Sequence, residues 1–269
     1  MKLTYLGTAA AEGFPAVFCR CEHCLNAKKL GGKNLRTRSQ SIINDDLLID
    51  LPADTYHHFL TNGIEGDKIK YLLITHDHAD HFYFDELDNR HGAYAHNMRC
   101  ETIKVICSAG TASLINNIPK NVEVTTISAF ETIALENYEI TALPARHRSA
   151  KDPFIYIIKG DKTLLYAHDT GYFFDEVFDY LEKNKIKLDM ISFDCTNVDI
   201  PISDEGGHMG FANIERVEKR LKSIGAVKSD TVLYVNHFSH NGVPLHEHLC
   251  NRASEYGYKV SFDGCAVEI

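Results

Sequence analysis

The 269-residue sequence contains no apolar run of the roughly 18–20 residues that a membrane-spanning helix requires. Its first ten residues include one early lysine but no apolar stretch long enough for a secretory signal peptide. No low-complexity tract, Pro/Ser-rich linker or fixed-period repeat interrupts the chain. These absences argue against membrane spans and repeat arrays, and we expect one globular domain over residues 1–269.

The sequence also lacks a positive net charge, because 37 acidic residues outnumber 28 basic ones and give −9 with histidine neutral. Proteins that bind long nucleic acid usually carry a positive field, since neutralising phosphates supplies most of that affinity. The charge therefore disfavours tRNA or DNA as a partner and favours a small molecule. A small phosphorylated substrate stays compatible, because bound metal ions supply local positive charge.

Cysteine is present at eight positions, and three of them crowd between Cys19 and Cys24. A secreted disulfide framework would come with a signal peptide and is a poor match to this spacing. We therefore expect a metal-binding cysteine cluster at residues 19–24 and a cytoplasmic location.

The apolar pattern alternates short strands with helices along the chain. Two helices are expected from apolar residues at helical spacing over 173–181 and 211–224, with Gly225 ending the second. This order fits an α/β fold of the αββα type, a four-layer sandwich of two sheets with helices outside, although order alone does not separate it from other α/β layouts. The expected strands are 3–6, 41–43, 47–50, 71–74, 104–107, 122–127, 138–143, 155–159, 163–166 and 231–235.

The most informative segment is Thr75–His81, which reads Thr-His-Asp-His-Ala-Asp-His directly after the expected strand 71–74. A strand that leads into such a turn presents several side chains to one point just beyond its end. Imidazole and carboxylate groups are the donors that hold Zn²⁺, Mn²⁺ or Fe²⁺. The segment thus predicts a metal-dependent hydrolase, with His76, His78, Asp80 and His81 as ligands.

Further ligands must come from other strand ends, because four residues from one segment cannot complete a two-metal site. His147, Asp169 and His237 each follow an expected strand by a few residues. In a sandwich these strand ends would meet at one edge. His168 lies beside Asp169 and is the alternative ligand there.

These residues resemble the His-x-His-x-Asp-His motif and downstream ligands of the metallo-β-lactamase superfamily, over nearly the whole chain. The resemblance implies the metallo-β-lactamase fold and two divalent catalytic ions, Mn²⁺ or Zn²⁺ with Fe²⁺ as a third candidate. Two such ions lower the pKa of a shared water toward neutrality. Asp80 and Asp169 would be catalytic residues that orient this water. The resemblance assigns His76, His78 and His147 to one ion, Asp80, His81 and His237 to the other, and Asp169 as the bridge.

The cysteines form Cys-x-Cys-x-x-Cys at Cys19, Cys21 and Cys24, a thiolate spacing that favours one structural Zn²⁺ with a fourth ligand. His23, Cys265 and His240 are the candidates for that ligand, and we choose His240. The combination of this cluster with His237-Phe238-Ser239-His240 resembles the PhnP-like branch of phosphodiesterases. Because His237 and His240 are three residues apart, we hypothesise that removing the structural zinc displaces a catalytic ligand.

The Gly206–Gly210 loop contains His208 ahead of the second expected helix. In the PhnP-like pattern a histidine in this context contacts the substrate phosphate. We therefore expect His208 to be a substrate-binding residue, acting as phosphate ligand or as general acid for the leaving alkoxide.

The leading functional hypothesis is a phosphodiesterase that cleaves a small, cyclic ribose-type phosphodiester. The same superfamily offers RNase Z-like ribonucleases, lactonases and thioester hydrolases as alternatives, and a single-iron persulfide dioxygenase as a non-hydrolytic one. The charge disfavours the ribonuclease, and the cysteine cluster disfavours the lactonase and thioester hydrolase. A complete two-ion ligand set disfavours a one-iron site. The resemblance also implies a homodimer.

Overall fold

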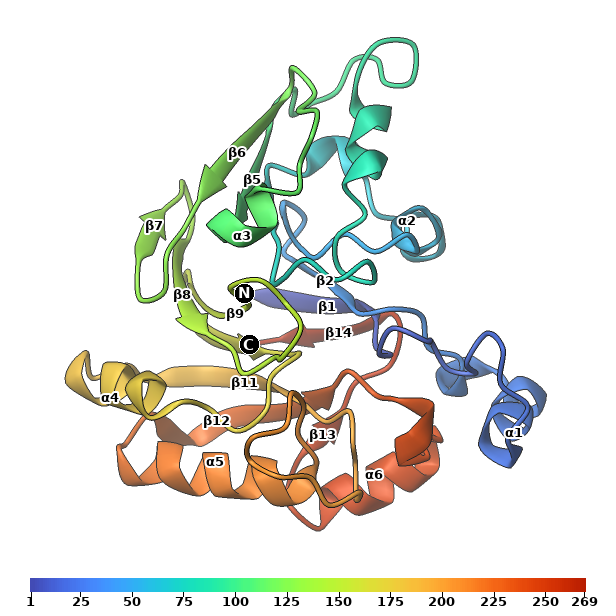
Figure 1. Ribbon diagram of the computed structural model, residues 1–269, viewed down its shortest axis with the longest axis vertical. Coiled ribbons are helices and arrows are strands. Elements are labelled where there is room, and N and C mark those ends of the chain that lie inside the picture. Colours follow the sequence, from blue (N-terminus) through green and yellow to red (C-terminus); the bar gives the residue numbers. More distant parts are fainter.

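The computed structural model describes all of residues 1–269 and contains two seven-stranded sheets that lie face to face (Figure 1). The first sheet has the order β14-β1-β2-β3-β4-β5-β6, and the second has the order β13-β12-β11-β10-β9-β8-β7. The strands are β1 Lys2–Gly7, β2 Gln40–Ile43, β3 Leu47–Ile49, β4 Tyr71–Leu73, β5 Ile103–Cys107, β6 Val122–Thr126, β7 Thr132–Ala134, β8 Glu139–Pro144, β9 Phe154–Lys159, β10 Thr163–Ala167, β11 Leu188–Asp194, β12 Val227–Asn236, β13 Lys259–Val260 and β14 Cys265–Glu268.

Helices lie on the outer faces of both sheets, except that the helix Glu22–Leu30 packs against the segment that follows β1. None of them is long and apolar enough to cross a membrane. The α-helices are α1 Glu22–Leu30, α2 Thr55–Asn62, α3 Ala109–Ala112, α4 Asp175–Lys183, α5 Phe211–Ser223 and α6 His246–Ser254. Short 3₁₀ turns are η1 Gly32–Asn34, η2 Gly66–Lys68, η3 Phe84–Arg90 and η4 His240–Gly242.

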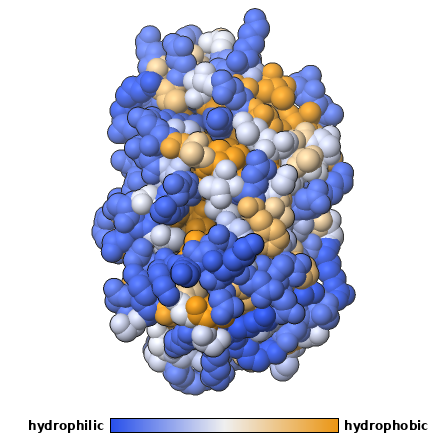
Figure 2. Space-filling view, turned by 90° about the vertical axis from the view of Figure 1, so that its left-hand side faces the viewer, coloured by the Kyte–Doolittle hydropathy of each residue, from blue (hydrophilic) through white to orange (hydrophobic).

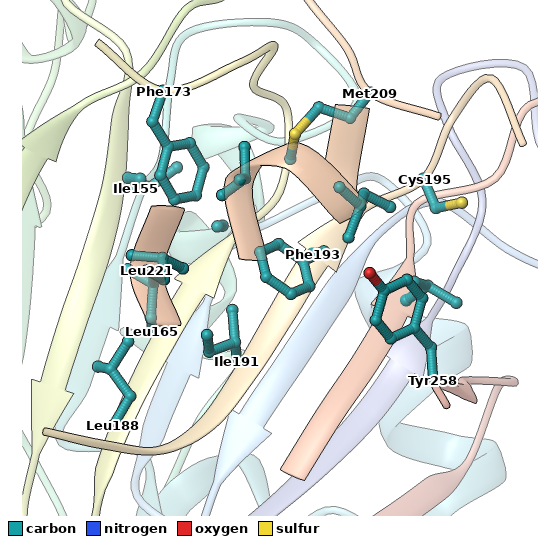
Figure 3. Close-up of a cluster of buried hydrophobic side chains, with 14 of the residues drawn as sticks. Ile155, Leu165, Phe173, Leu188, Ile191, Phe193, Cys195, Met209, Leu221 and Tyr258 are labelled. Carbon is teal, nitrogen blue, oxygen red and sulfur yellow. The ribbon is translucent and has the colours of Figure 1, made fainter. Parts of the chain in front are cut away.

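Three apolar clusters account for this layering. One fills the space between the sheets with residues of both, including Tyr5 and Leu73 from the first and Tyr156 and Met190 from the second. Another joins the outer face of the second sheet to α4, α5 and α6, and Figure 3 shows Phe193 and Ile191 within it. The third covers the outer face of the first sheet beneath α2. Each fully buried Leu, Ile or Phe side chain contributes about 1.5–3 kcal/mol, and the αββα sandwich expected from the sequence is confirmed.

Helix α5 illustrates how the sequence produces this packing. Phe211, Ile214, Val217 and Leu221 recur every three or four residues and are all buried. The helix ends where Gly225 adopts φ +70°, a left-handed conformation that glycine reaches at little cost. The face of the molecule in Figure 2 is by contrast mostly hydrophilic, with apolar side chains in smaller patches.

The sequence-based prediction omitted several elements. It left out four helices (α1, α2, α3 and α6) and four strands (β7, β11, β13 and β14). The omission of β11 matters most, because it is a central strand between β10 and β12 and carries part of the functional site at its end. Tight turns at Asn44–Asp46 and Gly160–Asp161 join the antiparallel pairs β2/β3 and β9/β10.

Candidate metal centre

The predicted ligands follow strands that end at the same edges of the two sheets. In the first sheet β3 and β4 are parallel, so Asp50 and the Thr75–His81 segment leave at one edge. In the second sheet β10, β11 and β12 are parallel, and β8 runs in the same direction because it is antiparallel to β9. Their ends therefore bring His147, Asp169 and His237 together.

One group of ligand atoms consists of three imidazoles. His76, His78 and His147 lie with one ring nitrogen each within 4.8 Å of the others. His147 Nε2 lies 3.0 Å from His78 Nδ1, while Nδ1 of His147 lies 3.2 Å from the Gly207 carbonyl oxygen. That carbonyl can accept a hydrogen from Nδ1, which leaves the lone pair of Nε2 facing His78.

A second group consists of Asp80, His81 and His237, also within 4.8 Å of one another. Asp169 lies between the two groups. Its Oδ2 is 2.9 Å from His237 Nε2 and 3.2 Å from His81 Nε2, and its Oδ1 is 3.9 Å from His147 Nε2. All seven residues predicted as catalytic ligands thus surround one point.

The chemistry of these atoms fits divalent cations. Four of them are buried and form no hydrogen bond, although they lie close to other polar atoms. These four unpaired atoms are His76 Nε2, His81 Nε2, His237 Nε2 and Asp169 Oδ2. Unpaired buried polar atoms are costly, at about 1–3 kcal/mol each. Atoms held about 2.0–2.1 Å from one tetrahedral ion lie about 3.3 Å from each other, close to the separations found here. Metal ions bound by the two groups would satisfy all four atoms.

The protonation states of these groups also suit metal binding. Burial opposes the charge of the Asp169 carboxylate, but His237 and His81 outweigh it and hold its pKa well below the usual range. Burial lowers the pKa of His76 and of His147, which favours their neutral, ligating form. For His81 burial acts in the same direction, but Asp169 and Asp50 dominate and raise its pKa. A metal would therefore displace a proton from His81.

Asp50 lies against the candidate ligand His81, and sequence reasoning did not assign it a role. Its Oδ2 lies 2.8 Å from His81 Nδ1, and its side chain accepts hydrogen bonds from the backbone N–H and the hydroxyl of Thr75. The carboxylate is completely buried. By accepting the Nδ1 hydrogen it directs Nε2 of His81 toward Asp80 and Asp169 and makes Nε2 the nitrogen that could bind a metal. Asp50 directly follows an apolar strand, as the candidate ligands do, and this position could have marked it as a candidate in the sequence.

Asp194 and Thr196, at the end of β11, are a second omission. The buried Asp194 carboxylate accepts hydrogen bonds from the backbone N–H groups of Asp169, Thr196 and Met209. It therefore joins three of the loops that form the site. Thr196 Oγ1 lies 2.8 Å from His237 Nδ1, so that hydroxyl can orient the His237 ring.

His208, which the sequence analysis assigned to the substrate, lies beside the ligand groups. Its ring stacks on His237 with centroids 5.5 Å apart, and its Nδ1 lies 3.0 Å from Asp194 Oδ2. Burial disfavours the imidazolium, but the Asp194 carboxylate outweighs burial and raises the pKa of His208 to about 9. The hydrogen bond through Nδ1 leaves Nε2 for a substrate.

Three residues of the site have left-handed backbone conformations. Asp50, Asp169 and His237 have φ angles of 65°, 52° and 63°. Such conformations cost non-glycine residues about 1–3 kcal/mol and cluster at functional sites. Here each one turns the chain sharply just after a strand, which directs its side chain into the site.

His168, the alternative to Asp169, lies away from the ligand groups. Its Nε2 is 2.7 Å from Ser192 Oγ, and its Nδ1 is 3.2 Å from the Asn236 amide nitrogen. Both ring nitrogens therefore have partners within the buried interior, and the structure favours Asp169 over His168.

The cysteine cluster forms a separate centre at the base of α1. Cys19, Cys21, Cys24 and His240 present ligand atoms within 4.8 Å of one another, whereas neither His23 nor Cys265 joins this group. His240 Nδ1 lies 3.6 Å from Cys24 Sγ and 3.9 Å from Cys21 Sγ. A zinc ion with Zn–S of about 2.3 Å and Zn–N of about 2.0 Å separates such atoms by about 3.6 Å.

The charges of two thiols differ in this cluster. The Cys24 backbone N–H donates to Cys21 Sγ and, with His240, lowers the pKa of Cys21 to about 6. Burial raises the pKa of Cys24. Thiolates are the form that binds zinc, so Cys21 could bind a zinc ion as it is, whereas Cys24 would first have to lose a proton.

A cavity of about 410 Å³ opens over the two ligand groups. It contains no Lys or Arg side chain and no aromatic ring other than histidine. Beyond the histidines and aspartates it is lined by Ala10, Ala11, Glu12, Ser149, Thr196, Asn197, Ser239 and Asn241.

Residues 48–238 match the model of the β-lactamase superfamily domain. The chain belongs to this superfamily. With this family and the two-sheet sandwich, the chain is a hydrolase of the metallo-β-lactamase fold. No curated protein matches its sequence.

Solved structures share this fold over the full length of the chain. A diphosphatase from the PhnP family is 22% identical, with a TM-score of 0.77 over 100% of this chain and 97% of the other. The Zn²⁺-bound PqqB from Methylobacterium extorquens is 17% identical, with a TM-score of 0.76 over 100% of both chains. The short form of human tRNase Z is 16% identical, with a TM-score of 0.67 over 100% and 99%. The sequence analysis expected a similarity to PhnP-like proteins, and this similarity is found at the level of the fold.

Proposed function

We propose that this hydrolase is a phosphodiesterase with two catalytic metal ions that cleaves a small, cyclic ribose-type phosphodiester. The observation that carries the proposal is the position of Asp169 between two complete ligand groups, with unpaired atoms of both groups facing it. Paired ligand sets of this kind suit phosphoryl chemistry, because two cations can neutralise both the attacking and the leaving oxygen. Mn²⁺ and Zn²⁺ are the preferred candidates for N/O ligands of this type.

When bound, the two ions supply an activated water and offset charge that develops on the phosphate. His76, His78 and His147 would hold one ion, and Asp80, His81 and His237 the other, with Asp169 facing both. Asp80 and Asp169 would accept hydrogen bonds from the attacking water and so orient it. Asp50 keeps Nε2 of His81 free for its ion by accepting the Nδ1 hydrogen.

His208 is the residue we assign to the phosphate. The Asp194 carboxylate fixes its Nδ1 hydrogen, so Nε2 can donate to a phosphate oxygen or pass a proton to the leaving alkoxide. The stacking of its ring on His237 keeps this nitrogen close to the ligand groups. No lysine or arginine lines the cavity, so the ions and His208 would provide its positive charge.

The Cys19, Cys21, Cys24 and His240 centre is assigned to one structural zinc. Backbone hydrogen bonds join the same regions of chain, since Ala10 N–H donates to the Phe238 carbonyl and Phe238 N–H to the Thr8 carbonyl. A zinc at His240 would therefore brace the segment that carries His237.

The test is a substrate panel on protein stripped of metal and reloaded with Mn²⁺, Zn²⁺ or Fe²⁺ separately. The panel holds bis-p-nitrophenyl phosphate, cyclic ribose phosphates, 2′,3′-cyclic nucleotides, a lactone, a thioester and a precursor tRNA. We expect phosphodiester turnover and a preference for cyclic ribose phosphates. Turnover of the lactone or thioester without any phosphodiester, or of tRNA alone, would overturn the proposal. Metal analysis should give three ions per chain.

A further inference from the structure

Glu12 is a carboxylate on the cavity wall that the proposed chemistry does not use. It comes from the segment between β1 and α1, and it is half-buried. Its Oε1 accepts hydrogen bonds from Ser239 Oγ at 2.7 Å and from the His240 backbone N–H at 3.1 Å. These bonds hold the side chain in one place beside the catalytic groups. No hydrogen bond occupies Oε2.

The charge of Glu12 has no cation within ion-pair distance. The other carboxylates of the cavity differ in this respect, because Asp80 and Asp169 lie 2.9–3.2 Å from imidazole nitrogens. Glu12 forms no such pair, and no Lys or Arg side chain lines the cavity. It therefore presents an uncompensated negative charge to whatever part of a substrate lies beyond the catalytic groups.

The cavity that Glu12 lines also carries neutral hydrogen-bonding groups. Ser149, Asn197 and Asn241 line the same space, and no Phe, Tyr or Trp side chain offers a surface on which a nucleobase could stack. This part of the cavity suits a small polar group. A carboxylate accepts hydrogen bonds from hydroxyl or ammonium groups and repels a second phosphate.

We propose that Glu12 determines specificity: it selects a diester whose part beyond the scissile phosphate carries hydrogen-bond donors, and it rejects one that carries a second phosphate. This inference rests on the proposed function. A hydrogen bond to a charged partner corresponds to about a 10- to 100-fold effect on kcat/KM. We expect the discrimination between a donor and a phosphate at that position to be at least this large.

The experiment compares three ribose 2,3-cyclic phosphates that differ at carbon 5, which carries a hydroxyl, an amino group or a phosphate. We expect the metal-loaded wild type to prefer the first two over the 5-phosphate by at least 10-fold in kcat/KM. The ratio of the amino to the hydroxyl compound shows which donor the site prefers. Equal kcat/KM for the 5-phosphate and 5-hydroxyl compounds would overturn the inference.

Glu12→Gln isolates the charge, because its amide oxygen can still accept from Ser239 and His240. We expect the preference for 5-hydroxyl over 5-phosphate to fall at least 10-fold in this variant. Glu136→Gln is the matched control, since Glu136 pairs with Lys70 outside the cavity, and it should keep the wild-type ratio. An unchanged ratio in Glu12→Gln would show that Glu12 has only a structural role and would overturn the inference.

The salt dependence of substrate discrimination distinguishes a charge effect of Glu12 from a purely structural role. Rejection of the 5-phosphate by wild type should weaken as ionic strength rises, because salt screens charge repulsion. The same rejection in Glu12→Gln should vary less with salt. Equal salt dependence in the two proteins would count against the inference. If no cyclic phosphate or bis-p-nitrophenyl phosphate is hydrolysed by wild type, the proposed function fails first and this inference fails with it.

Discussion

Replacement of Asp50 by Asn tests whether a buried carboxylate sets the metal affinity of His81. Asp50 accepts two hydrogen bonds from Thr75 and lies 2.8 Å from His81 Nδ1. In Asp50→Asn the amide oxygen can still face Thr75, so the NH₂ group faces His81 and donates to Nδ1. The His81 hydrogen then moves to Nε2, the atom directed at Asp80 and Asp169. A protonated Nε2 cannot bind a metal.

The expected loss is 10- to 100-fold in affinity for one of the two catalytic ions, or about 1.4–2.7 kcal/mol. Competition of the stripped protein against a metal chelator measures it. The affinity for the ion assigned to His76, His78 and His147 should change less, because Asp50 forms no hydrogen bond to these residues. Asp54→Asn is the control, since Asp54 lies in the same connection between β3 and α2 but pairs with Arg38. Wild-type affinity for both ions in Asp50→Asn would refute the reasoning.

Three further predictions follow from buried or ligand-forming groups. Cys21→Ser should remove one zinc per chain and also lower catalytic metal occupancy at His237; metal analysis with unchanged catalytic occupancy would contradict the coupling. Burial lowers the pKa of His58 to about 4, against about 6.5 in the unfolded chain. Above pH 6.5 His58 is neutral in both states, so its titration does not lower stability. As pH drops toward 4 only the unfolded chain takes up this proton, and the free energy of unfolding falls by about 3 kcal/mol. Urea unfolding from pH 7 to 4 should show a smaller fall in His58→Gln, and equal falls would be the contrary result. Asp194→Ala leaves three backbone N–H groups without their acceptor and should lower the free energy of unfolding by about 3–5 kcal/mol, measured by urea denaturation; a loss below 1 kcal/mol would show that other groups replace the carboxylate.

The ligand residues could be predicted from the sequence because they follow strands with clear apolar patterns. The apolar run Tyr71–Ile74 is followed directly by the histidine-rich motif, so a short stretch of sequence predicts both the strand and its candidate ligands. His147, Asp169 and His237 lie within a few residues of other such strands. Their convergence then follows from parallel strand direction, which the order of the elements indicates but does not prove. Their role as metal ligands stays a prediction, as do the homodimer, the single domain and the cytoplasmic location.

The residues that orient the ligands were harder to find. Strand β11 reads Leu-Asp-Met-Ile-Ser-Phe-Asp, and the polar Asp189 and Ser192 interrupt its apolar pattern. Both have partners that only the fold supplies: Asp189 pairs with Lys228, and Ser192 Oγ lies 2.7 Å from Tyr5 OH and from His168 Nε2. Because β11 was not predicted, nothing in the sequence indicated that Asp194 lies near His208, which is fourteen residues away.

Glu12 shows the same limit across a much greater distance along the chain. Its hydrogen-bond partners Ser239 and His240 lie 227 and 228 residues away, so no local pattern connects them. The cysteine cluster did predict that residues 19–24 meet His240, and this one contact implies that the chain just before Cys19 passes near the end of β12. What it does not imply is the side of that segment that faces the cavity. That choice depends on the backbone pairing of Ala10 with Phe238, which fixes the orientation of residues 10–12 and directs Glu12 toward the ligand groups. Candidate metal ligands can thus be predicted from sequence spacing, whereas the residue we assign to specificity depends on how two distant segments pair.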